Sequence, residues 1–215
     1  MQDLSSLQFK GDDSLAASFF AQTTSKIWHS ASTARPIRWR PRNFPAGAAA
    51  GEPIRLFADI EEGADRRGYA ACRAGVAAPA LPMTGAASSS APTIFCSSTR
   101  RGRAVLSVDA PSRLKIVSEA QGDHVAIIGE NRKLLVFPLS EAPRMARGTG
   151  VRMQRYKDGG VSDAKVFPLK DGLTWTDASA RVFTIDRAEL KDWIGHRAEA
   201  GRLPPRGFPR NNRFG

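Results

Sequence analysis

Residues 122–169 read GDHVAIIGENRKLLVFPLSEAPRMARGTGVRMQRYKDGGVSDAKVFPL, and this stretch decides the fold. Two apolar runs, at 124–128 and 134–137, are joined by the compact connection Gly129-Glu130-Asn131-Arg132, a spacing typical of a β-hairpin. A proline-marked exit, a turn rich in glycine and arginine, and a return to strand pattern follow it. We therefore predict an all-β fold. Further strand-like runs occupy residues 114–118, 151–156, 164–167, 173–176 and 181–185.

The glycine- and arginine-rich turn has a counterpart earlier in the chain, at residues 98–109 (STRRGRAVLSVD). Placing Arg101-Gly102 on Arg147-Gly148 gives an offset of 46 residues. A repeat of that size made of short strands is typical of blades, so we assign residues 1–185 to blade-like repeats.

The end of the chain is predicted to differ from the repeats. Asp186 followed by Glu189 is the pattern of an N-cap with its capping-box partner. It predicts a helix over 186–200, and the remaining residues, 201–215, form a basic tail broken by prolines.

The charge balance indicates the kind of partner. Lys and Arg outnumber Asp and Glu by 32 to 21, which gives a net charge of +11 and favours a polyanion such as nucleic acid. No run of eighteen apolar residues predicts a membrane span, and the N-terminus lacks the pattern of a secretory signal. The two cysteines, Cys72 and Cys96, do not form a CxxC pair, so neither a disulfide framework nor a zinc site is indicated. We expect a bacterial cytoplasmic location.

Two segments, 26–50 and 66–96, have an anomalous composition. They contain no acidic residue and consist largely of Ala, Arg, Pro, Gly and Ser, without a helical or strand period. They could be flexible basic linkers, since such residues bury too little apolar area to order themselves. We favour a second interpretation, in which GC-rich coding DNA is read out of frame over these segments. Translation of the coding DNA in all three frames tests it.

The candidate DNA-binding residues are the cations of the two basic turns. Glycine lets the backbone approach a phosphate closely, and the arginine fork matches phosphate oxygens. Such contacts supply affinity without sequence choice, so we expect duplex DNA to be bound and bent around the domain. No catalytic residue and no metal site is assigned: the three histidines lie far apart, and Tyr156 has no general base beside it in the sequence. The candidates are Arg100, Arg101, Arg103, Arg144, Arg147, Arg152, Arg155 and Lys157.

Residues 122–167 resemble the C-terminal DNA-wrapping domain of type IIA topoisomerase A subunits. EPIRLFADIEEGAD at 52–65, RRGRAVLSVDAP at 100–111 and the stretch from Asp192 to the end of the chain share the resemblance. It is closer to topoisomerase IV than to gyrase, because residues 145–150 are only a degenerate form of the glycine-rich box of gyrase A subunits. The resemblance covers about two thirds of the chain.

The resemblance implies a β-pinwheel, a propeller-like disc of four-stranded blades that binds DNA on its rim. We expect this disc to be incomplete, because the anomalous segments lie where family strands should be. The implied partners are double-stranded DNA, the remainder of the A polypeptide and the ATPase-bearing B polypeptide of a heterotetramer. ATP and Mg would serve the parent enzyme, which decatenates and relaxes DNA, while this fragment carries neither cofactor nor catalytic tyrosine. Two alternatives stay open: a noncatalytic protein-interaction scaffold, and a non-functional frameshifted product.

Overall fold

The structure is a computed structural model that describes residues 121–143 and 151–215 in full and, before them, the strands alone. The strands preceding residue 121 are β1 (Lys26–Ala31), β2 (Ile37–Trp39), β3 (Arg66–Cys72), β4 (Pro79–Thr84), β5 (Ser89–Ser90), β6 (Thr93–Ile94) and β7 (Leu114–Glu119). Those following it are β8 (His124–Gly129), β9 (Leu134–Pro138), β10 (Val151–Arg152), β11 (Val161–Phe167), β12 (Leu173–Thr176) and β13 (Val182–Ile185). Two 3₁₀ turns, η4 (Leu139–Glu141) and η5 (Leu169–Asp171), and the helix α1 (Arg187–Leu190) complete the described elements.

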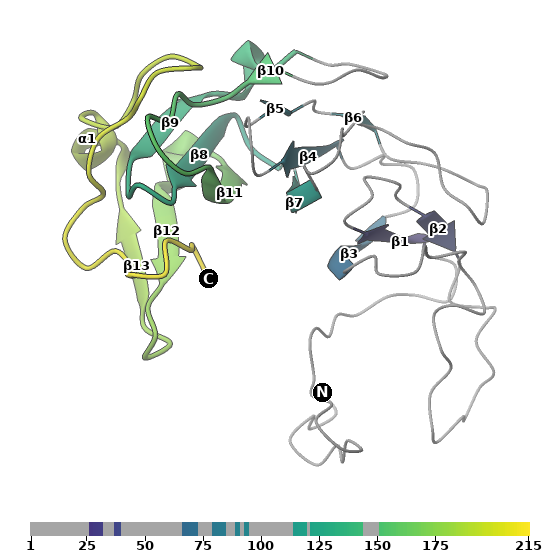
Figure 1. Cartoon of the computed structure of the whole chain (residues 1–215). Coiled ribbons are helices and arrows are strands. Elements are labelled where there is room, and N and C mark those ends of the chain that lie inside the picture. Colours follow the sequence, from purple (N-terminus) through teal and green to yellow (C-terminus); the bar gives the residue numbers. More distant parts are fainter. Residues whose placement is uncertain are drawn as a thin grey trace.

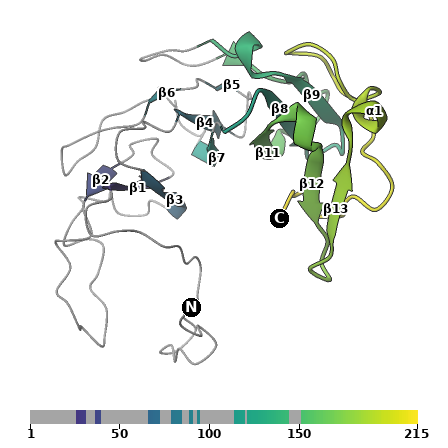
Figure 2. The ribbon, with the colours of Figure 1, turned by 180° about the vertical axis from the view of Figure 1, so that it is seen from behind.

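The described strands form four antiparallel sheets that follow one another around an arc in chain order (Figures 1 and 2). The first has the order β2-β1-β3, and the second contains β10-β5-β4-β6 with β7 paired to β4. The third is β11-β8-β9, and the fourth is the hairpin β12-β13. The arrangement is the all-β succession of blades that the sequence predicts.

The chain crosses between neighbouring sheets at β10. After β9 of the third sheet it returns to the second sheet, where Val151 and Arg152 pair with Ser90 and Ser89. It then enters β11, whose residues pair with β8 along its whole length. This exchange ties the third sheet to the second and brings the basic residues after Val151 to the junction between them.

The third sheet is buried on both faces, which explains why β8 and β9 are continuously apolar. Val125 and Ile127 of β8 point into one cluster together with Met153 and Val161. Their neighbours in the strand point to the opposite face, where a second cluster forms around Trp175, Leu173 and Leu190. The second cluster also takes Phe208 and Phe214 from the end of the chain. The hairpin expected at 129–132 is confirmed, with Arg132 in the left-handed conformation at φ 59°.

The helix after residue 186 is shorter than the sequence pattern predicts. The capping box is confirmed: the Asp186 carboxylate accepts hydrogen bonds from the backbone N–H groups of Ala188 and Glu189. The helix nevertheless ends at Leu190 rather than near Ala200. The Val136 N–H donates to the Trp193 carbonyl, and the Gly195 N–H donates to the Val136 carbonyl. The edge of β9 thus takes the backbone groups that a longer helix would have needed.

Strands occur in both segments of anomalous composition, with β1 and β2 in 26–50 and β3 to β6 in 66–96. Whether these segments are read in frame stays a hypothesis. The strand expected at 54–60 lies outside the described residues. Among the residues that the structure describes, no helix has the length and apolar character needed to cross a membrane.

Candidate nucleic-acid interface

The second basic turn leads into residues 151–157, here called the basic loop, in which one buried pair of residues is flanked by exposed cations. Met153 and Gln154 are completely or almost completely buried, at 0% and 1% exposure. Arg152, Arg155 and Lys157 are exposed around them. Because the interior residues of the loop are packed, the three cations project from a fixed backbone rather than from a loose one.

The basic loop lies against residues 194–202, here called the return segment. The Arg155 N–H donates to the Glu199 carbonyl (2.9 Å), and the Ala198 N–H donates to the Met153 carbonyl (2.8 Å). The Arg197 guanidinium donates to the Arg152 carbonyl at 2.7 Å. These bonds form a seam between segments that are distant in the sequence. Arg197 and Arg202 therefore belong to a segment that packs directly against the basic loop.

The buried side chain of Gln154 connects the two segments of the seam. Its side-chain amide donates to the Lys133 carbonyl (2.9 Å) and to the Ala200 carbonyl (2.8 Å). On the other side of the return segment, Leu134 and Arg202 exchange two backbone hydrogen bonds of 2.7 and 2.9 Å. A buried amide that bridges two carbonyls holds both chains at one separation.

Gly201 is the residue that lets the return segment come this close. Its φ is +75°, and a Cβ atom there would stand 2.5 Å from the Leu134 carbonyl oxygen and 2.9 Å from Nε2 of Gln154. Both the left-handed backbone and the close approach require glycine at this position.

The sequence-predicted candidates have different outcomes. Arg152, Arg155 and Lys157 are exposed and lie in one loop. Sequence reasoning missed Arg197, and it considered Arg202 only as part of a separate tail, because the predicted helix had placed residues up to 200 elsewhere. Gly195 and Gly201, near the two ends of the return segment, are the sequence signal that could have indicated this segment. The remaining candidates lie outside the described residues: Arg100, Arg101, Arg103, Arg144 and Arg147.

One acidic group near the seam, Glu141, is held by hydrogen bonds. Glu141 accepts from His196 Nδ1 (3.0 Å) and from the Arg197 N–H (2.7 Å). Partial burial opposes ionisation of Glu141, but these bonds prevail and lower the pKa of its carboxyl. The same pair raises the pKa of His196, first through the hydrogen bond and then through the carboxylate charge. His196 therefore carries more positive charge near neutral pH than a free histidine would.

Tyr156 and His124 both contact residues of the core. The Tyr156 ring packs against the first core cluster and beside Gly129, where an added Cβ would stand 2.5 Å from Cε1 of Tyr156. His124 lies 3.0 Å from the Asp123 carboxylate and contacts the Phe167 ring. In the part of the chain that the structure describes, no three His, Cys, Asp or Glu side chains gather as a possible metal site.

Comparison with known proteins identifies relatives of this chain and solved structures with the same architecture. The chain is 34% identical over 214 residues, 100% of its length, to the topoisomerase 4 A polypeptide of Caulobacter vibrioides, and 32% identical over 99% of its length to that of Rickettsia bellii. It covers 28% of the length of each. The structure superposes on the E. coli ParC C-terminal domain with a TM-score of 0.75 at 22% identity, over 95% of this chain and 86% of that one.

The chain belongs to the family of topoisomerase IV A subunits. It corresponds to their C-terminal domain and has the β-pinwheel fold. The fold is shared with the DNA gyrase A C-terminal domain, which superposes with a TM-score of 0.62 at 9% identity, over 85% of this chain and 60% of that one. No family model matches the chain. The predicted fold and family resemblance are thereby confirmed.

Proposed function

We propose that this domain binds the phosphate backbone of duplex DNA through the basic loop and the return segment. The observation that carries the proposal is the seam, which holds exposed Arg152, Arg155 and Lys157 beside Arg197 and Arg202 on rigid backbone. Cations carried on a fixed backbone lose less entropy on binding a phosphate than cations on a mobile loop. The arginines of the two turns outside the described residues belong to the same proposal on the basis of the sequence.

The surface favours backbone contact over base reading. In the described residues the only α-helix, α1, has four residues, too short to serve as a recognition helix in a major groove. Cations on a curved succession of blades suit binding and bending of duplex DNA without sequence choice. Glu199 contributes to the seam through its backbone carbonyl, which accepts from the Arg155 N–H and fixes the loop in place.

The activity of the whole protein is proposed from the family. The chain spans 28% of its relatives' length, so ATP-dependent decatenation and relaxation of DNA would require the rest of the A polypeptide together with an ATPase-bearing B polypeptide. ATP and Mg would be bound in those parts. In this proposal the domain works in the bacterial cytoplasm, at the nucleoid, where it guides DNA toward the remainder of the enzyme.

The test compares two variants with the same change of charge. R152A/R155A/K157A removes the cations of the basic loop, while K170A/R187A/K191A removes three exposed cations at and beside η5 and α1. Affinity for a duplex is measured across a salt series, where each phosphate contact contributes about 0.9 to the log–log slope. We expect the first variant to lose about 2.7 from the slope, since three contacts are removed.

The control variant should keep most of the slope. Equal losses in both variants would show that only net charge matters and would refute a localised surface. An unchanged slope in the folded basic-loop variant would also refute it. A flat slope in the unmodified chain would favour a protein-docking scaffold instead.

A further inference from the structure

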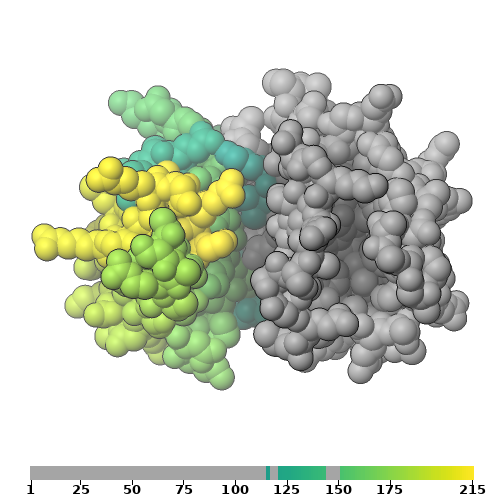
Figure 3. Space-filling view, turned by 90° about the horizontal axis from the view of Figure 1, so that it is seen from below, coloured from purple at the N-terminus to yellow at the C-terminus, as the bar shows by residue number. Residues whose placement is uncertain are grey.

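The last residues of the chain, 203–215, form a strap that lies against the described sheets; in Figure 3 its yellow atoms lie at the surface next to green and teal atoms. Three of its arginines, Arg206, Arg210 and Arg213, are exposed. The sequence pattern suggested an extended basic tail, which was also the alternative place for DNA contact. The structure instead gives the strap a defined course with its own turns and anchors.

Two consecutive turns shape the strap. The Phe208 N–H donates to the Pro205 carbonyl, and the Asn212 N–H donates to the Pro209 carbonyl, both at 3.2 Å. The sequences are Pro-Arg-Gly-Phe and Pro-Arg-Asn-Asn, so each turn has proline first and arginine second. The φ of Gly207 is +84°, the conformation that a type II turn needs at its third position. Each arginine thus occupies a turn corner.

The residue that ends each turn is buried, and so is the residue after Arg213. Phe208 and Phe214 are each 5% exposed and belong to the second core cluster, while Asn212 is 8% exposed. The Phe208 ring packs on Trp175 at 5.4 Å and edge-on to Phe214 at 5.4 Å between centroids. The pattern of an exposed arginine followed by a buried anchoring residue therefore occurs three times within the nine residues 206–214.

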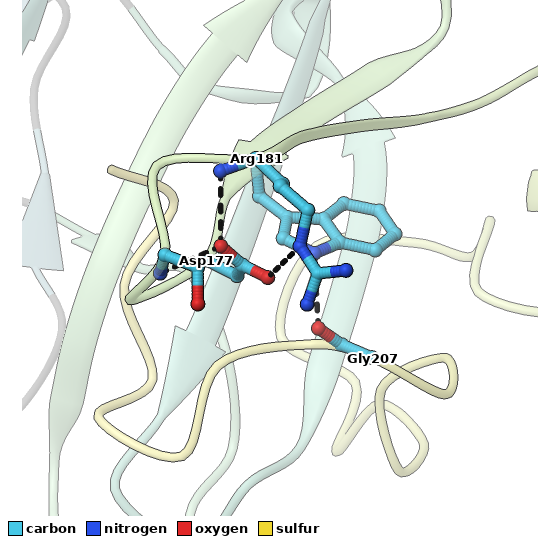
Figure 4. A network of polar contacts seen from close by, with 5 residues as sticks. Asp177, Arg181 and Gly207 are labelled. Carbon is cyan, nitrogen blue, oxygen red and sulfur yellow. Dashed lines mark hydrogen bonds and ion pairs between the residues drawn. The ribbon is translucent and has the colours of Figure 1, made fainter.

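Hydrogen bonds fix the backbone between the anchors. The Arg132 guanidinium donates to the Asn212 amide oxygen (3.1 Å) and to the Pro209 carbonyl (3.3 Å). The Asp163 carboxylate accepts from the Phe214 N–H (2.8 Å). The Trp175 indole donates to the Gly207 carbonyl at 3.3 Å, close to the turn in which Asp177 pairs with Arg181 (Figure 4).

The three exposed arginines have no carboxylate within ion-pair distance among the described residues. Asp163 is close enough to Arg213 for the two charges to interact, but both of its oxygens already accept backbone N–H groups, from Ala164 and Phe214. Arg132 and Arg181, by contrast, are occupied by bonds within the domain. The positive charge of the strap is thus available to an external anion.

We propose that the strap is a second, preorganised phosphate-binding surface, on which Arg206, Arg210 and Arg213 engage the backbone of the same duplex as the basic loop. This proposal rests on the proposed function. Arg202 is bonded to Leu134 beside the basic loop and lies four residues before Arg206, so the strap continues the chain that carries the return segment. Unpaired guanidiniums at rigid corners match phosphate in charge and geometry.

Four forms of the chain test this: the unmodified chain, R206A/R210A/R213A, R206K/R210K/R213K, and the alanine strap variant combined with R152A/R155A/K157A. The affinity for a random-sequence duplex is measured across a salt series, and thermal melting checks that each variant is folded. We expect the strap alanine variant to lose about 2.7 from the slope, and the combined variant about 5.4. The lysine variant should keep the slope, because it keeps the charges.

The outcomes separate this proposal from the previous one. A folded strap alanine variant with unchanged slope and affinity overturns the strap surface, even if the basic-loop variant is weakened. A loss in the strap variant with no loss in the basic-loop variant supports the strap and refutes the basic loop. The strap alanine variant could instead lose binding to an acidic polypeptide while keeping its affinity for the duplex. This outcome would also overturn the strap proposal, since it would identify a protein partner.

Discussion

Gly201→Ala adds a single methyl group, but it should lower the free energy of unfolding of the domain by much more than such a small change usually does. The substitution places a Cβ on a residue with φ +75°, which costs about 1 kcal/mol for the left-handed conformation. The Cβ would also meet the Leu134 carbonyl oxygen at 2.5 Å, so the strands must separate. The two hydrogen bonds between Leu134 and Arg202 would be lost, at about 1 kcal/mol each. The expected loss in free energy of unfolding is about 3 kcal/mol.

Gly207→Ala is the matched control. Its φ is +84°, but a Cβ there meets only Cε1 of Phe183, at 3.7 Å. The backbone cost is the same and the steric cost is absent, so we expect a loss of about 1 kcal/mol. Urea unfolding followed by tryptophan fluorescence measures both variants. With an m-value of about 2 kcal/mol per molar urea, the midpoints should fall by about 1.5 M for Gly201→Ala and about 0.5 M for the control.

Equal midpoints for the two glycine variants would refute this reasoning. They would mean that the return segment can move away from Leu134 without loss, so that the seam does not hold the basic loop. A larger loss for Gly201→Ala shows that the close approach itself is stabilising.

Two further predictions concern local contacts. Asp186→Ala removes both hydrogen bonds that its carboxylate accepts in the first turn of α1, so the free energy of unfolding should fall by about 1 kcal/mol. Glu189→Gln keeps an acceptor and should change this free energy little. An Asp186→Ala variant with unchanged stability would contradict the contribution of the cap. NMR titration should give His196 a pKa above its ordinary 6.5, since the Glu141 carboxylate stabilises the imidazolium, and Glu141→Gln should return it toward 6.5. Because the folded-state pKa of His196 is raised and that of Glu141 is lowered, this pair stabilises the fold fully only between about pH 4.5 and 6.5, the ordinary pKa values of the two groups. The stabilisation is lost as pH rises through the folded pKa of His196 or falls through that of Glu141. An identical His196 pKa in both proteins would exclude the pairing.

Local patterns in the sequence predicted much of the third and fourth sheets. The apolar runs of β8 and β9, the connection at 129–132 and the strands β12 and β13 all lie where the pattern placed them. The capping box at Asp186 was also predicted correctly. These features depend on neighbours within a few residues, so a single chain suffices to recognise them.

The candidate site was only partly predictable. The exposed cations of the basic loop follow from composition, but β10 is shorter than the strand expected at 151–156. The return segment explains the difference, because its backbone pairs with the Met153 carbonyl and the Arg155 N–H in place of a continued ladder. The buried side chain of Gln154 adds hydrogen bonds to the Lys133 and Ala200 carbonyls. Its bond to Ala200 joins residues 46 apart, a contact that no local period reports.

The sequence by itself determined the all-β class, the hairpin, the helix cap and the strong positive charge, since each depends on residue type and short-range spacing. Only the tertiary structure decided how the cations are grouped. The edge of β9 ended the helix early and paired with the return segment, which brought Arg197 and Arg202 beside the basic loop. Burial of Phe208, Asn212 and Phe214 turned a basic tail into an anchored strap. Both results arise from long-range contacts, in which backbone groups and aromatic rings find partners that lie far away in the sequence.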